Sequence, residues 1–230
     1  MTKFWKVMNT IYEKTMLGIF VIALLVVIYA MYDTWYVFDH ANDDSLLAFK
    51  PNTVNAAEND DSPIASDMVG WITVNDTNID YPIMQGIDNT QYLNLDPYGE
   101  FSLSGSIFLD SRNDPKFTDP YSVIYGHHME YGKMFGALDD FLNEDYLNTH
   151  KTGELLVGRD GKVALRLELF YAMKTDAKEK MVFDPAHHKE LKKFLEAQGF
   201  KSENRILCLS TCAGAASSER TAVFAYILEN

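Results

Sequence analysis

The feature that most constrains the fold of this chain is an uncharged apolar run near the N-terminus, Met16–Tyr32. As a helix this run would be about 25 Å long, because each residue adds about 1.5 Å along a helix axis. That length just crosses the hydrocarbon core of a bilayer, with Trp35 and Tyr36 at the interface. A buried core helix and a cleaved signal peptide are the alternatives. The residues after Ala30 are too bulky for a small-x-small cleavage site, so the sequence favours an uncleaved signal anchor.

Charged residues flank this run unevenly and predict its orientation. Lysines precede it and aspartates follow it, namely Lys3, Lys6 and Lys14 on one side and Asp33, Asp39, Asp43 and Asp44 on the other. Because positive charge favours the cytoplasmic side of a membrane, we expect residues 1–15 in the cytoplasm and the chain beyond Asp33 outside the cell. The predicted location is therefore the cell membrane, crossed once by residues 16–32.

The rest of the chain divides into a tether and one domain. Residues 33–66 are predicted to be an extracytoplasmic tether with possible short helices, since residues 39–66 are rich in Asp, Asn, Ala and Ser. From residue 67 to residue 230 strand-like runs predominate. Hydrophobic residues make up 47% of the chain, which is enough for a core. The net charge of −13 argues against a nucleic-acid partner, which requires a basic surface.

Short apolar runs predict a mainly β domain. The predicted strands are Val69–Val74, Ile79–Met84, Ser106–Leu109, Tyr121–Tyr125, Val163–Tyr171, Arg205–Thr211 and Arg220–Leu228. Two short helices are expected. One follows His127, where apolar residues recur at helical spacing, and one covers residues 185–198, where Asp184 resembles an N-cap. Many short strands with few helices indicate a barrel or a sandwich rather than a doubly wound sheet.

The chain has two cysteines, Cys208 and Cys212, which fall on one predicted strand. Their Cα atoms would be about 13 Å apart, since each residue of a strand advances about 3.3 Å. A disulfide needs a separation under about 7 Å, so both thiols are predicted to be free. Cys208 is flanked by leucines and fits a buried structural role. Cys212 stands where the strand meets a loop of small residues, a setting that suits a nucleophile.

A histidine pair and an arginine complete the candidate chemistry. His127 and His128 follow Gly126 at the end of another apolar strand. Successive side chains of a strand point to opposite faces, so one of the two can face a given site, and the pattern does not choose between them. Arg220 opens the strand after Cys212, where a guanidinium can stabilise an oxyanion or hold a carbonyl. A thiol, an imidazole and a guanidinium are the parts from which acyl transfer can be built.

Metal binding is the other chemistry that these residue types allow. The possible ligands are His127, His128, His187, His188 and the two cysteines. Adjacent histidines lack the usual gap of two to four residues between ligands, and the second pair falls on the polar side of its predicted helix. We therefore predict no metal and no other cofactor.

Several of these motifs together resemble the sortases, the membrane-anchored transpeptidases of Gram-positive bacteria. The matching positions are Leu209-Ser210-Thr211-Cys212, Arg220 and Tyr125-Gly126-His127. Four further segments resemble the class B branch of the family, namely Val69-Gly70-Trp71-Ile72, Asn78–Ile83, Gly105–Asp110 and the helical insert at 185–198. The likeness covers roughly residues 67–228. Cys208 departs from it, since the family commonly has threonine there, and the tether contains no Asp-Pro-aromatic lid motif of the class C enzymes.

The resemblance implies a closed sortase β-barrel of about eight strands with short helices, plus one N-terminal transmembrane helix. In the catalytic domain at 67–230, Cys212 would be the nucleophile, His127 the general acid and base, and Arg220 the oxyanion or substrate clamp. Ser210 and Thr211 are expected to touch the substrate. That substrate would be a secreted protein with a C-terminal sorting motif like Asn-Pro-x-Thr-x. Cleavage through a thioacyl intermediate would join it to an amine of peptidoglycan or its precursor, or to a pilin lysine.

Two other functions stay open. A cysteine peptidase or cell-wall amidase would use the same thiol with water as the acceptor, although papain-like and related wall hydrolases place the cysteine before the histidine in the chain. A membrane-anchored binding domain without enzymatic activity would not need the thiol of Cys212. Addition of an amine tests the first alternative, and substitution of Cys212 tests the second.

Overall fold

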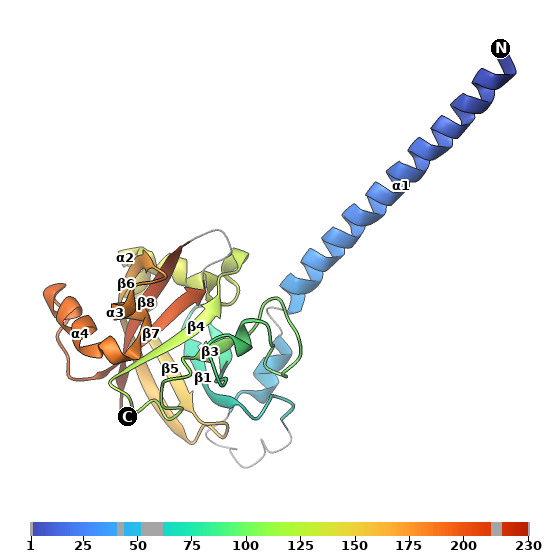
Figure 1. Cartoon of the computed structure of the whole chain (residues 1–230). Coiled ribbons are helices and arrows are strands. Elements are labelled where there is room, and N and C mark those ends of the chain that lie inside the picture. The colour runs from blue at the N-terminus through green and yellow to red at the C-terminus, as the bar shows by residue number, and fades with distance from the viewer. Residues whose placement is uncertain (1, 41–43, 52–61, 213–217, 230) are drawn as a thin grey trace. The chain divides into compact units, whose positions relative to one another are not determined.

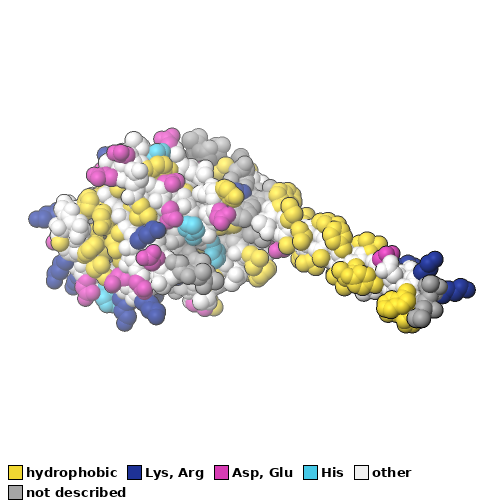
Figure 2. Space-filling model, turned by 90° about the horizontal axis from the view of Figure 1, so that it is seen from above, with side chains coloured by type: hydrophobic (Ala, Val, Ile, Leu, Met, Phe, Trp, Pro, Cys, Tyr) yellow, Lys and Arg dark blue, Asp and Glu magenta, His cyan; other side chains and the backbone are white. Residues whose placement is uncertain are grey.

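The computed structural model of the chain describes residues 2–40, 44–51, 62–212 and 218–229. The chain separates into two units, Met1–His40 and Ala41–Asn230. The first unit is a single helix, α1 (Thr2–His40), which contains the predicted span 16–32. Its stretch Lys3–Trp35 is long and apolar enough to cross a membrane. Figure 2 shows apolar side chains along this helix and lysines near its N-terminal end.

The second unit is a closed β-barrel (Figure 1). Its strands are β1 (Met68–Val74), β2 (Asp80–Met84), β3 (Ile107–Leu109), β4 (Tyr121–His127), β5 (Thr152–Val157), β6 (Val163–Asp176), β7 (Arg205–Cys212) and β8 (Glu219–Leu228). Around the barrel they follow the order β1-β2-β3-β4-β7-β8-β6-β5, and β5 closes onto β1. The pairs β2–β3 and β4–β7 are parallel, and the other neighbours are antiparallel. The predicted barrel of about eight strands is confirmed.

Short helices connect and cover the strands. They are η1 (Asp44–Phe49), η3 (Gln91–Leu93), η4 (Glu130–Gly132), η5 (Phe135–Leu142), α2 (Glu144–Thr149), α3 (Lys180–Phe183), η6 (Pro185–His187) and α4 (His188–Ala197). The helix predicted at 185–198 is present as η6 followed by α4. The side chain of Asp184 accepts a hydrogen bond from the amide of Ala186, as an N-cap does. The segment after His127 forms the 3-10 helix η5, and β5 is a strand that the sequence did not predict.

The core consists of two apolar layers. One layer draws side chains from all eight strands and therefore fills the barrel; it includes Leu207 and Leu209 of β7. The other layer lies between the outer face of the barrel and the covering helices, and it includes Ile206 and Cys208 of β7. The predicted alternation of β7 is confirmed, since odd and even positions enter different layers.

Strand β6 shows where simple alternation fails. Alternation from Leu165 predicts Tyr171 on the same face, yet Leu165 lies in the barrel interior and Tyr171 packs against the outer layer. The register against β8 shifts between Leu169 and Tyr171, so one extra residue is inserted there. Such a bulge reverses the faces of all the side chains that follow it.

Residues 44–51 belong to the segment predicted to be a tether, and they pack on the barrel. Leu46 of η1 is buried in the outer layer. The Nζ atom of Lys50 donates to Asp80 Oδ1 at 2.8 Å and to Thr73 Oγ1 at 2.7 Å. This part of the segment is therefore fixed against β1 and β2.

Candidate active site

The parallel pairing of β4 and β7 brings the candidate histidine and cysteine to one edge of the barrel. The register pairs Tyr125 with Ser210, Gly126 with Thr211, and His127 with Cys212. Figure 1 shows the two strands running the same way, so both carboxyl ends meet at this edge. Two residues far apart in the sequence thus become direct neighbours through the backbone register alone. The side chain of Cys212 and residues 213–217, including the predicted small-residue loop, lie outside the described residues.

Gly126 allows the strand to carry His127 to this position. A Cβ atom at residue 126 would lie 2.4 Å from Cδ1 of Ile107 and 2.7 Å from Cγ of Phe135. Both contacts are shorter than real Cβ contacts, and both neighbours belong to the barrel interior. The residue before the histidine therefore has to be glycine for β3, β4 and η5 to pack this closely.

The ring of His127 is half-buried and held by a backbone carbonyl. Its Nε2 atom lies 2.7 Å from the carbonyl oxygen of Leu93 in η3. A carbonyl oxygen can only accept, so Nε2 carries a proton and Nδ1 is the nitrogen left for proton exchange. The fold thereby fixes both the direction of the ring and its tautomer.

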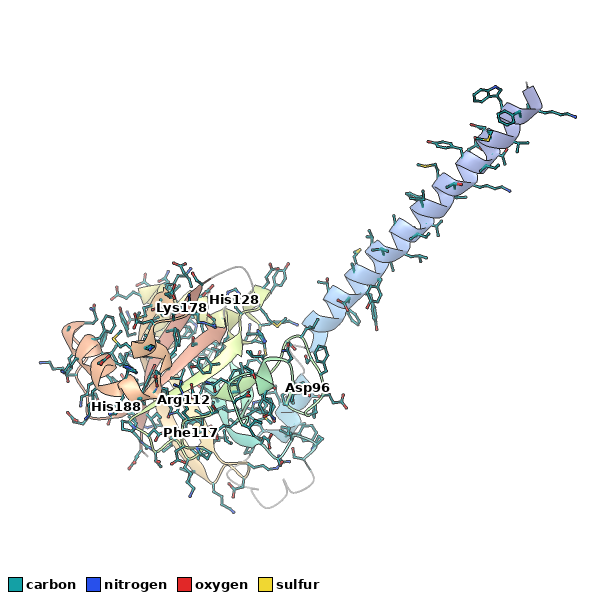
Figure 3. All side chains as sticks on the ribbon, in the orientation of Figure 1. Asp96, Arg112, Phe117, His128, Lys178 and His188 are labelled. Atoms are coloured by element: carbon teal, nitrogen blue, oxygen red, sulfur yellow. The ribbon has the colours of Figure 1, made fainter. Side chains whose placement is uncertain are left out.

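His128 takes a different direction and a different partner. Its Nε2 atom lies 2.9 Å from Oδ2 of Asp139 in η5, and both side chains are partly exposed (His128 is labelled in Figure 3). Burial raises the pKa of Asp139, but hydrogen bonds from Thr221 and His128 oppose this and bring it below its usual value. The structure thus gives the two histidines separate surroundings, with His127 on the backbone of η3 and His128 on a carboxylate.

Arg220 reaches the same edge from the start of β8. Its Nη1 atom donates to the carbonyl oxygen of Thr211 at 3.0 Å. That oxygen belongs to the peptide unit directly before Cys212. The centre of its guanidinium lies 5.9 Å from the ring centroid of Phe183 in α3. The arginine is therefore held between the end of β7 and an aromatic face, a geometry in which a cation is attracted by the ring.

Ser210 and Thr211 are both buried, and their hydroxyl groups bond within the protein. Ser210 Oγ donates to the carbonyl of Thr211 at 3.1 Å, and Thr211 Oγ1 accepts from the amide of Thr221 at 3.0 Å. The first bond lies within β7, and the second ties the end of β7 to β8. The geometry supports a role in holding the strand end, and contact between these two residues and a substrate stays a prediction.

Cys208 has the surroundings of an inert thiol. It is free and wholly buried in the outer layer, as predicted. Burial raises the pKa of this thiol to about 12, and a hydrogen bond with Tyr121 only partly opposes the effect. A thiol with so little thiolate and no access to solvent cannot be the reactive one.

An ion pair between the half-exposed Arg112 and the buried Asp110 holds the insert between β6 and β7 in place. Arg112 donates to the buried carboxylate of Asp110 at 2.7 Å, to Asp184 at 2.9 Å and to the carbonyl of Phe183 at 2.9 Å (Arg112 is labelled in Figure 3). Burial raises the pKa of Asp110, yet the bonds from Arg112 and Asn89 outweigh it and leave that pKa below its usual value. Through this pair the loop after β3 fixes Phe183, and with it the aromatic face against Arg220.

Three parts of the site were not predicted from the sequence: Asp139, Thr221 and the carbonyl of Leu93. A backbone carbonyl carries no sequence signal, and Asp139 is one of two adjacent aspartates in an amphipathic segment. Among the residues that the structure describes, no three side chains of His, Cys, Asp or Glu come together as metal ligands would.

Comparison with known proteins agrees with this geometry. The sortase domain family matches residues 72–228. Sortase B of Staphylococcus aureus (strain NCTC 8325 / PS 47) is 35% identical over 180 residues, which are 72% of each chain. Spy0129, a Streptococcus pyogenes class B sortase involved in pilus biogenesis, is 37% identical with a TM-score of 0.63, over 71% of this chain and 94% of that one.

A complex of Staphylococcus aureus sortase B with its substrate is similar as well. It is 34% identical with a TM-score of 0.61, over 72% of this chain and 82% of that one. The family match covers most of the barrel, and the sequence and structural relatives point to the same branch. The chain therefore belongs to the class B branch of the sortases, which are cysteine transpeptidases.

Proposed function

We propose that this chain is a membrane-anchored class B sortase that cleaves the C-terminal sorting motif of secreted proteins and transfers them to an amine. Cys212 is the nucleophile, His127 the general acid and base, and Arg220 the clamp on the developing oxyanion. The observation that carries the proposal is the β4–β7 register, which places His127 beside Cys212. The bond from Arg220 to the carbonyl of Thr211 supports it, because it brings a cation to the same edge.

The first half-reaction forms a thioester. The thiolate of Cys212 attacks the carbonyl carbon of the threonine in the sorting motif, and the oxygen of that carbonyl becomes negatively charged. The paired N–H groups of Arg220 stabilise this charge. The carbon–nitrogen bond then breaks, and the departing amine takes a proton from His127. Because Nε2 of His127 donates to Leu93, the proton comes from Nδ1 of the imidazolium.

The second half-reaction returns the thiolate. An acceptor amine attacks the thioester carbon, gives a proton to Nδ1 of His127, and forms a new amide as the carbon–sulfur bond breaks. An amino group of peptidoglycan or its precursor is the proposed acceptor. A pilin lysine is the second candidate, since a similar class B sortase is involved in pilus biogenesis. Both acceptors require the same chemistry at the thioester.

The proposed location follows from α1. Residues 16–32 cross the membrane, residues 1–15 lie in the cytoplasm, and the tether 33–66 and the catalytic domain 67–230 lie outside. The support is the apolar stretch Lys3–Trp35 with its lysines at the start and aspartates after residue 32. In this arrangement the enzyme would meet secreted substrates and lipid-linked cell-wall precursors on the same membrane face.

Peptide cleavage by the full chain tests the proposal. Peptides with variants of Asn-Pro-x-Thr-x are incubated with wild type, Cys212→Ala and the matched control Cys208→Ala, and the thioacyl adduct is sought by mass spectrometry. We expect an adduct and product with wild type and Cys208→Ala and neither with Cys212→Ala. Equal turnover by Cys212→Ala and wild type would contradict the nucleophile assignment.

The acceptor is tested in the same assay by adding triglycine or Nα-acetyl-lysine, which keeps a free ε-amine. A transpeptidase forms the new amide and turns over faster. A product released by water alone, at an unchanged rate, would favour the peptidase or amidase. Binding of the peptide without cleavage, unaffected by Cys212→Ala, would favour a binding domain.

A further inference from the structure

A carboxylate outside the proposed catalytic set joins two of the three strands that carry that set. Asp139 in η5 accepts a hydrogen bond from Nε2 of His128 at 2.9 Å through one oxygen. Its other oxygen accepts from the hydroxyl of Thr221 in β8. His128 directly follows β4, and Thr221 directly follows Arg220. The carboxylate therefore connects the residues next to His127 and next to Arg220.

Thr221 is held on two sides at once. Its hydroxyl donates to Asp139, and its amide donates to Oγ1 of Thr211 at 3.0 Å. Its side chain is buried, with 3% of its surface exposed. The backbone from which Arg220 projects is thus fixed by η5 on one side and by the end of β7 on the other.

Burial opposes the ionised form of Asp139, but the hydrogen bonds that it accepts and the nearby charge of Lys174 favour that form. His128 lies in contact with it, and Lys174 stands opposite Thr221 in the register of β6 and β8 and attracts the carboxylate. A hydrogen bond to an ionised acceptor is shorter and stronger than one between neutral groups. Asp139 thus holds Thr221 more firmly than a neutral acceptor would. Among the described residues, the Asp139 carboxylate forms no hydrogen bond or ion pair with Arg220 or Thr211, so its effect on Arg220 has to pass through Thr221.

We propose that Asp139 is a positioning residue for Arg220, acting through the Asp139–Thr221 hydrogen bond. The inference rests on the proposed role of Arg220 as the oxyanion clamp. Without the hydrogen bond from the Thr221 hydroxyl to Asp139, the start of β8 keeps only one of its two side anchors, the bond from the Thr221 amide to Thr211. The guanidinium of Arg220 then no longer points to where the oxyanion forms. A small displacement of a group that acts in the transition state is costly, and about 1 Å can reduce the rate on the order of 10²-fold.

Two substitutions break this bond from opposite ends. Thr221→Val keeps the shape of the side chain and removes the hydroxyl, and Asp139→Ala removes the acceptor from a partly exposed position. For each we expect kcat of peptide cleavage to fall about 10-fold or more with little change in KM, because the clamp acts in the transition state. Thr221→Ser restores the hydroxyl and should recover activity to within about threefold of wild type, since the bond can form again.

Matched controls separate positioning from general loss of stability. Thr152→Val removes a hydroxyl of β5 that accepts a hydrogen bond from Asn75, and Asp140→Ala removes the exposed carboxylate next to Asp139. Both should leave kcat unchanged. Circular dichroism and thermal unfolding of the full chain in detergent check that each variant is folded. If Thr221→Val fails to fold, Asp139→Ala carries the test.

A double-mutant cycle with Arg220→Ala decides the route. If Asp139 acts through Arg220, then Thr221→Val or Asp139→Ala costs less than about threefold once the arginine is absent, because their effects are coupled. Slow cleavage by Arg220→Ala is followed as thioacyl adduct by mass spectrometry. Equal losses in both backgrounds, or wild-type kcat in Asp139→Ala, would overturn the inference. Wild-type kcat in Arg220→Ala would instead refute the proposed clamp, which is a separate result.

Discussion

The different reactivity of the two cysteines follows from burial and can be measured directly. In Cys212→Ala the only thiol left is Cys208, which is wholly buried. Burial raises the pKa of this thiol to about 12, from an ordinary value of 9.0. At about pH 8 the thiolate fraction is therefore lower by about 10³-fold than for an unperturbed thiol.

The expected rate of alkylation of Cys208 is reduced by less than the 10³-fold reduction in its thiolate fraction. A more basic thiolate is a better nucleophile, with a Brønsted coefficient of about 0.4–0.5, and three pKa units recover about 20-fold. The net chemical effect is about a 50-fold slowing. The surrounding side chains add to it, since the reagent has to wait until the outer layer opens locally.

The measurement compares native and urea-unfolded Cys212→Ala with iodoacetamide at about pH 8, and mass spectrometry follows the modified fraction. We expect native Cys208 to react at least about 50-fold more slowly than unfolded Cys208, and in native wild type the label should appear first on Cys212. A native rate within about tenfold of the unfolded one would show that Cys208 is accessible. It would also remove the argument that one thiol alone is suited to catalysis.

Three further outcomes are expected. His127→Ala should lower the rate of peptide cleavage at least about 10²-fold, the scale of general acid–base catalysis, and His128→Ala should lower it far less. The reverse ranking would assign the acid–base role to His128. Arg220→Lys should lower the rate of cleavage about 10²-fold or more, because lysine keeps the charge without the paired donors. Near-normal turnover would show that Arg220 acts only as a surface charge. In intact protoplasts, added protease should digest the barrel and leave a protected fragment of α1; a barrel protected until lysis would reverse the proposed orientation.

Much of the barrel could be predicted because its strands alternate in the sequence. In β7 the leucines face the barrel interior and Cys208 faces the outer layer, as a period of two requires. The alternation of β6 fails beyond Leu169, where a bulge adds one residue, and single residues give no signal for a bulge. Strand β5 was missed because Gly153 and Glu154 interrupt the apolar pattern at its start.

The parts of the site could be chosen from the sequence, but their arrangement could not. His127 and Cys212 stand out because each ends an apolar strand, yet only the register shows that these two strands are parallel neighbours. The separation of His127 from His128 also depends on distant partners, the carbonyl of Leu93 and the carboxylate of Asp139. Leu93 is 34 residues from His127, and Asp139 is 11 residues from His128 in a separate helix, so local pattern cannot predict the tautomer or the role. The catalytic assignments themselves stay predictions until the variants are assayed.

The barrel topology places the site on a seam between two halves of the chain. Strands β1–β4 are neighbours in order and end with His127, while β5–β8 contribute Cys212 and Arg220, and the halves meet at β4–β7 and at β1–β5. Away from the site, a further contact joins the two halves, since Tyr121 of β4 donates to the carbonyl of Val182 in α3 at 2.5 Å.

Arg112 crosses the same seam, because it joins Asp110 in the first half to Phe183 and Asp184 in the second. Opening of this seam separates the proposed acid–base residue from the proposed nucleophile while each half keeps its own hairpins. When the β4–β7 pairing opens, activity should therefore be lost before the strand content is. We expect contacts that cross the seam, such as those of Arg112, to support activity for this reason.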